Sequence, residues 1–197
     1  EAFRKYAIEI GLSLNDKTVA IEEFWKNVNA FNKEIVEEKA NRYFFVDEPV
    51  EIKIEKASEK TVSLDLHPDF SKRGKRKLKV NGSVNISMTD FKKLGEGKVH
   101  RLMDYCNFEL KNDKFHFVSD KYEDYKSAKN SGHIIHWLPT EKNVKVDVVL
   151  ENGTTSTGLG EESMKKLSVG EIVQLERFAF CRLDSKEKNK LTFYYLH

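Results

Sequence analysis

Cysteine, long apolar runs and an excess of one charge are what this sequence has little of. It contains only two cysteines, Cys106 and Cys181, and neither has another Cys or His at metal-binding spacing beside it. We therefore expect a reduced protein without structural zinc. No apolar run approaches the roughly 18 residues that a membrane span requires, and no signal peptide opens the chain. A cytoplasmic protein with no membrane partner is predicted.

The charges nearly cancel, because 34 Lys and Arg stand against 32 Asp and Glu and leave +2. A contact with nucleic acid would therefore come from a local basic patch rather than from a basic tail. The 197 residues suffice for one large domain or for two to three small ones. The first residue is Glu1 rather than Met, so the chain is expected to be a piece of a longer protein or to have been shortened at its front.

The first forty or so residues follow a helical period. Apolar positions spaced by three and four residues predict two amphipathic helices, carried by Phe3, Tyr6, Ala7 and Ile10 and then by Phe24, Val28, Phe31 and Ile35. Gly11 is placed to end the first helix. The period changes near Ala40, so residues 1–42 are predicted to form a small helical region.

From Tyr43 onward the apolar residues alternate with polar ones. Short runs of this kind, separated by polar turns, are typical of small antiparallel barrels or sandwiches; they include 50–54, 62–66, 78–80 and 84–88. Asn152-Gly153 predicts a hairpin turn between two such runs. The polar stretch 121–132 is predicted to be a loop, and 163–167 at most one helical turn. The length of this part favours two small barrels over one.

The sequence gives no sign of catalytic chemistry. His133 and His136 are three residues apart, but their surroundings indicate a strand, so we interpret them as ordinary strand histidines rather than metal ligands. No nucleophile elbow, glycine-rich phosphate loop or zinc-protease motif occurs. We therefore expect no catalytic residue, no metal and no cofactor in this chain.

Two basic features remain as candidates, and each has a plain structural alternative. One is the stretch 70–80, which contains Lys72, Arg73, Lys75, Arg76, Lys77 and Lys79. It is equally consistent with a phosphate-binding loop and with a solvated hairpin turn. The other is Arg42, which precedes Tyr43, Phe44 and Phe45. This combination suits stacked, unpaired bases, but a hydrophobic junction with an incidental arginine explains it as well.

Five ordered stretches carry a more specific signal: NRYFFVDEPVEI (41–52), LHPDFSKRGKRKLKV (66–80), GKVHRLMDYCN (97–107), HIIHWLP (133–139) and VGEIVQLERFAFCRLDS (169–185). Together they resemble the C-terminal, tRNA-binding half of archaeal-type glutamyl-tRNA synthetases, whose anticodon-binding part is shared with the glutaminyl enzymes. The opening residues resemble the helical stretch that follows the catalytic domain of that family. The resemblance covers essentially the whole chain.

The resemblance implies a mainly β fold of two small antiparallel barrels, the proximal one interrupted by the distal one, after a short helical stem-contact region. It places the stem-contact region at 1–42, the proximal anticodon-binding barrel at 43–112 with 171–197, and the distal barrel at 113–170. The family joins an amino acid to tRNA with ATP and magnesium, and its HIGH-like and KMSKS-like signatures do not occur here. The chain alone is therefore expected to be inactive. The expected partner is a tRNA that accepts glutamate, with tRNA for glutamine as an open second partner, and not DNA.

The resemblance also implies the residues that bind RNA. Arg42, the pair Gln174 and Arg177, and Arg101 occupy positions that contact anticodon bases in the glutaminyl relative, and Lys98 in the same GK-x-x-R motif as Arg101 is also expected to bind RNA. Met103 replaces a second arginine of that relative, and 92–96 is shorter than its counterpart. These departures affect the outer bases, so contacts to the middle base are the firmest expectation. A planar guanidinium or an amide can make two hydrogen bonds to an unpaired base.

Some alternatives stay open. Glu176 either supports the Arg177 guanidinium from behind or forms a structural ion pair on the far face of the strand. A glutaminyl enzyme is an alternative source of the chain, although NRYFFV and Met103 favour glutamate. A β-barrel that binds protein partners and no RNA is a third hypothesis, which the presence of Arg42, Arg101, Gln174 and Arg177 disfavours.

Overall fold

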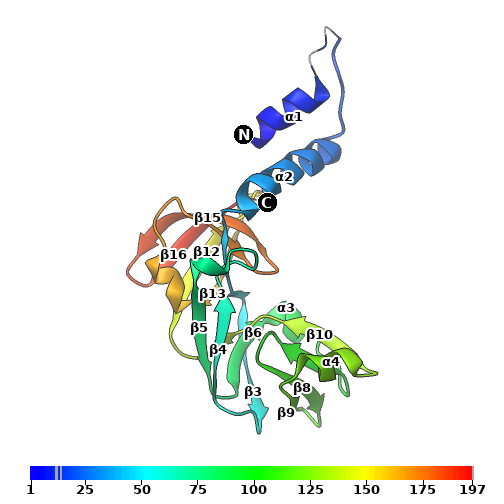
Figure 1. Cartoon of the computed structure of the whole chain (residues 1–197), viewed down its shortest axis with the longest axis vertical. Coiled ribbons are helices and arrows are strands. Elements are labelled where there is room, and N and C mark those ends of the chain that lie inside the picture. Colours follow the sequence, from blue (N-terminus) through cyan, green and yellow to red (C-terminus); the bar gives the residue numbers. More distant parts are fainter. Residues whose placement is uncertain (12, 14, 197) are drawn as a thin grey trace.

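The computed structural model describes residues 1–11, 13 and 15–196. Figure 1 shows two helices at one end of an elongated molecule, a barrel-like sheet in the middle and a second sheet at the far end. The predicted fold class, mainly β with a short helical region in front, is confirmed. None of the helices in the described ranges is both long and apolar enough to cross a membrane.

Both predicted helices are present, as α1 (Ala2–Ile10) and α2 (Ile21–Glu37). Gly11 follows α1 with a φ of 76°, a conformation that favours glycine, and so ends the helix as predicted. The Tyr6 ring packs edge-on against Phe24 with 5.2 Å between the ring centroids. Phe3, predicted on the same apolar face, also lies near Phe24, with 6.2 Å between the ring centroids, but remains 63% exposed.

A seven-stranded sheet, here called the closed sheet, lies next to α2. Its order is β1-β14-β15-β16-β12-β13-β2. The edge strands β1 (Asn41–Tyr43) and β2 (Phe45–Asp47) are separated only by Phe44. One short segment therefore pairs with both ends of the sheet, which nearly closes on itself. The remaining strands are β12 (Asn143–Val149), β13 (Thr155–Glu161), β14 (Ile172–Leu175), β15 (Ala179–Glu187) and β16 (Lys190–Tyr195).

A second seven-stranded sheet, here called the open sheet, has the order β10-β7-β8-β9-β3-β6-β11. A separate hairpin of β4 (Lys60–Asp65) and β5 (Lys75–Val80) covers its core. The strands of the open sheet are β3 (Pro49–Glu55), β6 (Ser83–Ser87), β7 (Val99–Leu102), β8 (Cys106–Lys111), β9 (Lys114–Ser119), β10 (Ser131–Ile135) and β11 (Leu138–Pro139). Most pairings in the molecule are antiparallel, but β1 with β14, β12 with β16, β3 with β9 and β7 with β10 are parallel.

The strand pairing shows how one sheet interrupts the other. Residues 49–139 build the open sheet and its hairpin, while β1, β2 and β12–β16 build the closed sheet. The sheets do not divide at the predicted boundaries, because β9 and β10 pair within the open sheet and β12 and β13 within the closed one. Alternating apolar residues give the face of a strand but not the sheet it joins. The segments 43–112 with 171–197 and 113–170 stay a prediction of domain limits, and His197 lies outside the described residues.

Local predictions had mixed outcomes. The Asn152-Gly153 turn joins β12 and β13 as an antiparallel hairpin, and η2 (Glu162–Lys166) is the single helical turn expected. The loop predicted for 121–132 was wrong, because it contains the helix α4 (Tyr122–Ser127) and the start of β10. Acidic residues in its first turn favour α4, and the Tyr125 hydroxyl donates to the Gly132 carbonyl at 2.8 Å. The other short helices are α3 (Met88–Phe91) and η1 (Ser71–Arg73).

Gly158 permits the close approach of β13 to β2, and a larger residue at this position is expected to disrupt the pairing of these two strands. A Cβ at this position would lie 2.2 Å from the Val46 carbonyl oxygen. Gly158→Ala should therefore lower the free energy of unfolding by about 2–3 kcal/mol, measured by urea denaturation. Ser156→Ala on the same strand is the control and should change it by less than about 0.5 kcal/mol. Equal stability of the two variants would contradict this account of the closure.

Candidate nucleic-acid interface

The structure places Arg42 and Gln174 side by side. Strands β1 and β14 run parallel with Arg42 in register with Gln174, so the two side chains leave the sheet on the same face. Both residues are half-buried. Neither side chain has a hydrogen-bond or ion-pair partner among the described residues, and the Arg42 Nε is fully buried without one. Two side chains with strong donor and acceptor groups are thus held together and left free to bind.

Arg177 does not lie in a strand, although the alternating sequence around it predicted one. Strand β14 ends at Leu175, and Arg177 adopts a φ of 60°, the left-handed region. The turn is tied by hydrogen bonds from the Glu176 N–H to the Tyr43 carbonyl at 2.9 Å and from the Phe178 N–H to the Leu175 carbonyl at 3.0 Å. This reversal directs the Arg177 guanidinium away from the Gln174 face and toward α3.

The Arg177 guanidinium forms a bidentate ion pair with the buried carboxylate of Asp90. Its Nη1 and Nη2 donate to the two oxygens of Asp90 at 2.7 and 3.0 Å. Asp90 is fixed in turn, because its backbone N–H donates to the Ser87 hydroxyl at the start of α3 at 3.0 Å. Burial alone would raise the pKa of Asp90, but the hydrogen bonds and charge of Arg177 outweigh it and hold that pKa below its ordinary value. Arg177 still exposes 36% of its side chain.

A neutral His136 is the second side chain that binds the Arg177 guanidinium. Its Nε2 lies 2.6 Å from the Phe45 carbonyl, which can only accept, so Nε2 carries the proton. The other ring nitrogen, Nδ1, is then free to accept from Arg177 Nη1 at 3.1 Å. Burial and the nearby Arg177 charge lower the pKa of His136. The two histidines therefore differ in role: His133 is an exposed residue of β10, whereas His136 is buried just after the end of that strand.

Glu176 does not support Arg177. Its carboxylate accepts from Arg76 Nη2 at 2.6 Å, which makes it the structural ion pair of the two alternatives. Arg76 also donates through Nε to Glu161 at 2.8 Å and through Nη1 to the Asp65 carbonyl at 2.7 Å. The two charged side chains of the central pair, Arg76 and Glu161, are 2% and 0% exposed. One residue of the basic run is thus part of the core.

Glu161 links this ion pair to the closure of the barrel. Its Oε1 accepts the Phe44 N–H at 2.7 Å, at the residue that separates β1 from β2, and its Oε2 accepts the Ser163 hydroxyl at 3.1 Å. Burial raises the pKa of Glu161, and the Arg76 charge counters part of that rise. Phe44 would otherwise have an unpaired N–H inside the protein, because it belongs to neither edge strand.

Arg101 and Lys98 lie in the open sheet, apart from Arg42 and Gln174. Arg101 is buried in β7, donates to the Asn107 side chain at 2.8 Å and stacks on the Tyr122 ring at 5.5 Å from its centroid. Lys98 is exposed just before β7. The predicted residues therefore form two groups on two sheets: Arg42 with Gln174 in the closed sheet, and Lys98 with Arg101 in the open sheet. Arg177 belongs to neither group, because its guanidinium pairs with Asp90 of α3.

The sequence predictions missed Asp90, His136 and the core role of Arg76. The spacing Ser87-x-x-Asp90 is a helix-capping signal that could have placed Asp90 at the start of α3, but not its partner 87 residues away. Among the described residues no group of three His, Cys, Asp or Glu side chains could hold a metal ion. Cys106 and Cys181 are buried free thiols, and burial raises the pKa of each to about 12.

Removing the Arg76 charge should destabilise the fold strongly, because it leaves the Glu161 carboxylate buried and unpaired. Arg76→Met is expected to lower the free energy of unfolding by about 3–5 kcal/mol, measured by urea denaturation. The double variant Arg76→Met with Glu161→Gln should recover part of this loss. Lys79→Met, an exposed change on the same strand, is the control. A loss as small as that of the control would contradict the assigned role.

The Asp90 carboxylate should stabilise the protein in a pH-dependent way. Its pKa is lowered by folding, so its contribution is present above the ordinary value of about 4 and is lost as the pH falls through the lowered pKa. Asp90→Asn should therefore reduce the thermal midpoint at pH 7, and the gap to the wild type should narrow below about pH 4. Asp16→Asn, an exposed change, should show no gap at either pH. A gap that stays constant down to pH 2 would argue against the ion pair.

Comparison with known proteins identifies the family of this chain. Residues 40–126 match a family described as tRNA synthetases class I (E and Q), anti-codon binding domain, and residues 134–184 match a second family of the same description. The two matched ranges take in most of both sheets.

Curated relatives give the same result. The glutamate–tRNA ligase of Methanobrevibacter smithii is 39% identical over 191 residues, which is 96% of this chain and 33% of the relative. Those of Methanococcus maripaludis strain S2 and Methanosarcina barkeri are 36% and 37% identical over the whole chain, which covers 35% and 34% of their lengths. The chain thus spans about a third of the relatives it matches. It belongs to the anticodon-binding region of the class I tRNA synthetases for glutamate and glutamine.

Proposed function

We propose that this chain is the tRNA-reading part of an archaeal-type glutamate–tRNA ligase, the enzyme that attaches glutamate to its tRNA. The observation that carries the proposal is the in-register pair Arg42 and Gln174, whose side chains have no partners among the described residues. A fully buried polar atom without a partner, such as the Arg42 Nε, is costly in a stable fold unless a ligand or water satisfies it. The relatives named above, all glutamate–tRNA ligases, support RNA as that ligand.

In this proposal the residues differ in what they contribute. Arg42 and Gln174 address the Watson–Crick edge of the middle anticodon base, because their donors and acceptors are unused. Arg177 is held by Asp90 and Arg101 by Asn107, so each offers only its remaining N–H groups, from a fixed position. Lys98 is exposed and has no ion-pair partner among the described residues, which suits a phosphate contact.

The chemistry of the reaction belongs to the rest of the parent enzyme in this proposal. ATP and magnesium would be held there, and this chain would bind and orient the tRNA without activating glutamate. A cytoplasmic location is proposed along with it. Helices α1 and α2 would contact the tRNA stem, next to the barrel that carries Arg42 and Gln174.

Binding to tRNA tests the proposal. The wild-type chain should bind a glutamate tRNA transcript and discriminate against one with a substituted middle anticodon base. Arg42→Ala and Gln174→Ala should each reduce that discrimination by about 1–3 kcal/mol, or roughly 5- to 150-fold in Kd, measured by fluorescence anisotropy. Arg182→Ala, an exposed arginine of the same sheet, is the matched control and should discriminate as the wild type does.

The alternatives give different results. A glutaminyl enzyme would bind glutamine tRNA in preference, although the relatives reported above are glutamate ligases. A protein-interaction module would show no measurable tRNA binding at low salt. Equal affinity of the wild type for both middle bases would refute the assignment of Arg42 and Gln174.

A further inference from the structure

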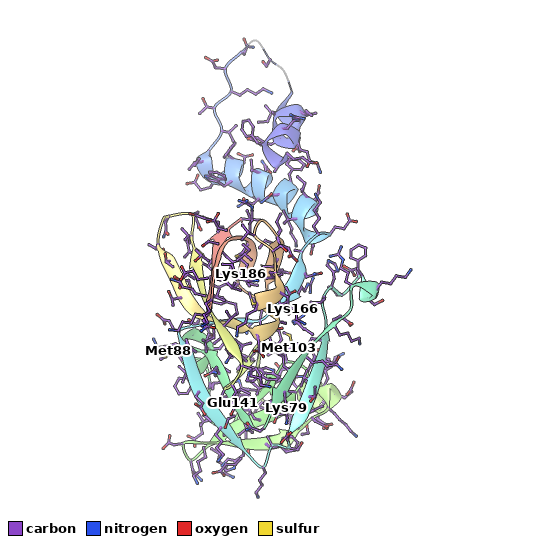
Figure 2. All side chains as sticks on the ribbon, turned by 90° about the vertical axis from the view of Figure 1, so that its left-hand side faces the viewer. Lys79, Met88, Met103, Glu141, Lys166 and Lys186 are labelled. Atoms are coloured by element: carbon purple, nitrogen blue, oxygen red, sulfur yellow. The ribbon has the colours of Figure 1, made fainter. Side chains whose placement is uncertain are left out.

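A cleft of about 850 Å³ lies where two consecutive strands separate. Only Asn81 and Gly82 join β5 to β6, yet β5 pairs with β4 while β6 pairs with β3 and β11. The two strands therefore diverge from their turn. The segment 139–142 and helix η2 contribute the other walls, and Figure 2 labels one residue from each of the three walls, Lys79, Glu141 and Lys166.

The charge of the molecule is concentrated in this cleft. Six lysines line it, against three glutamates, whereas the whole chain carries only +2. The lysines come from β5, from the segment after β11 and from η2, namely Lys75, Lys77, Lys79, Lys142, Lys165 and Lys166. The remainder of the molecule is correspondingly less basic, so an anion would be drawn to this concave surface.

Half of these lysines are available to a ligand. Lys75 pairs with Asp65 at 3.4 Å, Lys79 with Glu59 at 2.7 Å and Lys165 with Glu162 at 3.7 Å. Lys77, Lys142 and Lys166 are exposed and have no ion-pair partner in the part of the chain that the structure describes. One free ammonium group therefore stands on each of the three walls.

The free edge of β5 adds backbone donors. No strand in the described ranges pairs with β5 on the side away from β4, and alternate peptide groups of an antiparallel strand point to each side. Some N–H groups of β5 consequently face the cleft. Backbone N–H groups and lysine ammonium groups are both common ligands of phosphate.

We propose that this cleft binds a run of RNA phosphates, as a second contact separate from Arg42 and Gln174. The inference rests on the proposed function for the identity of the ligand. RNA is the occupant for which we argue, because tRNA is the ligand of this chain under the proposed function and the exposed residues of β5 are all lysines, whose ammonium groups suit a row of phosphates. The phosphate contact carries no base information, so it should add affinity without changing discrimination.

The test compares two triple variants with the same loss of charge. The cleft variant is Lys77→Ser, Lys142→Ser, Lys166→Ser. The control variant is Lys53→Ser, Lys111→Ser, Lys188→Ser, three exposed lysines outside the cleft. The Kd for a glutamate tRNA transcript is measured from 50 to 300 mM KCl, and circular dichroism checks that both variants are folded.

For the cleft variant we expect the slope of log K against log salt to become shallower by about two, because each lost phosphate contact contributes roughly 0.7–0.9. Affinity should fall by the same factor for tRNAs with the natural and the substituted middle base. The control variant should keep the wild-type slope to within about 0.5. This pattern would support the cleft as a phosphate site.

Three other outcomes would overturn the proposal, and they can be told apart. If the wild type binds tRNA with middle-base discrimination but both triple variants show the same slope, the cleft proposal fails and the proposed function stands. If the wild type binds no tRNA, the proposed function fails as well. If a decaglutamate peptide binds the wild type but not the cleft variant, while tRNA binding is unchanged in that variant, the cleft accepts acidic protein instead of RNA.

Discussion

The buried ion pair of Arg76 and Glu161 is the contact on which the rest of the structure depends. Arg76 comes from the hairpin over the open sheet, and Glu161 ends β13 of the closed sheet, so the pair joins the two halves. The same carboxylate accepts the N–H of Phe44, where the chain crosses from one edge of the closed sheet to the other. A buried pair of this kind adds little net stability over an apolar pair, but it penalises every arrangement that leaves either charge alone. It therefore fixes the relative position of hairpin, barrel closure and the turn that carries Glu176.

Local structure could largely be predicted from the sequence, because it depends on neighbouring residues. The periods of α1 and α2, the alternation of the strands and the Asn152-Gly153 hairpin all have the form that the residues indicate. The assignment of strands to sheets could not be predicted in this way, since β9 and β12 have similar alternation but pair in different sheets. Helix α4 was missed because its polar residues show no apolar period, and its stability comes from Tyr122 and Tyr125 meeting other elements.

Sequence reasoning likewise predicted some features of the candidate site and missed others. The adjacency of Arg42 and Gln174, expected from the family resemblance, requires a parallel pairing across about 130 residues that no local pattern contains. Gln174 is also the only glutamine in the chain. The direction of the Arg177 side chain could not be predicted, because an alternating pattern does not indicate a residue with left-handed backbone angles that is neither Gly nor Asn. Its carboxylate partner comes from α3 and its histidine partner from the link between β10 and β11, which only the folded chain brings together.

The insertion of the open sheet between β2 and β12 has a consequence for the order of folding. The open sheet contains only strands from one continuous stretch, 49–139, so all of its strands are available once that stretch has been synthesised. The closed sheet begins at Asn41 but has β16, Lys190–Tyr195, in its middle, between β15 and β12. Its first strand must therefore wait for about 150 further residues, an entropically costly delay for long-range contacts. The strands of the open sheet would leave the ribosome long before the surface that carries Arg42 and Gln174 can form, so the proposed base-reading pair is the last part of this structure to be assembled.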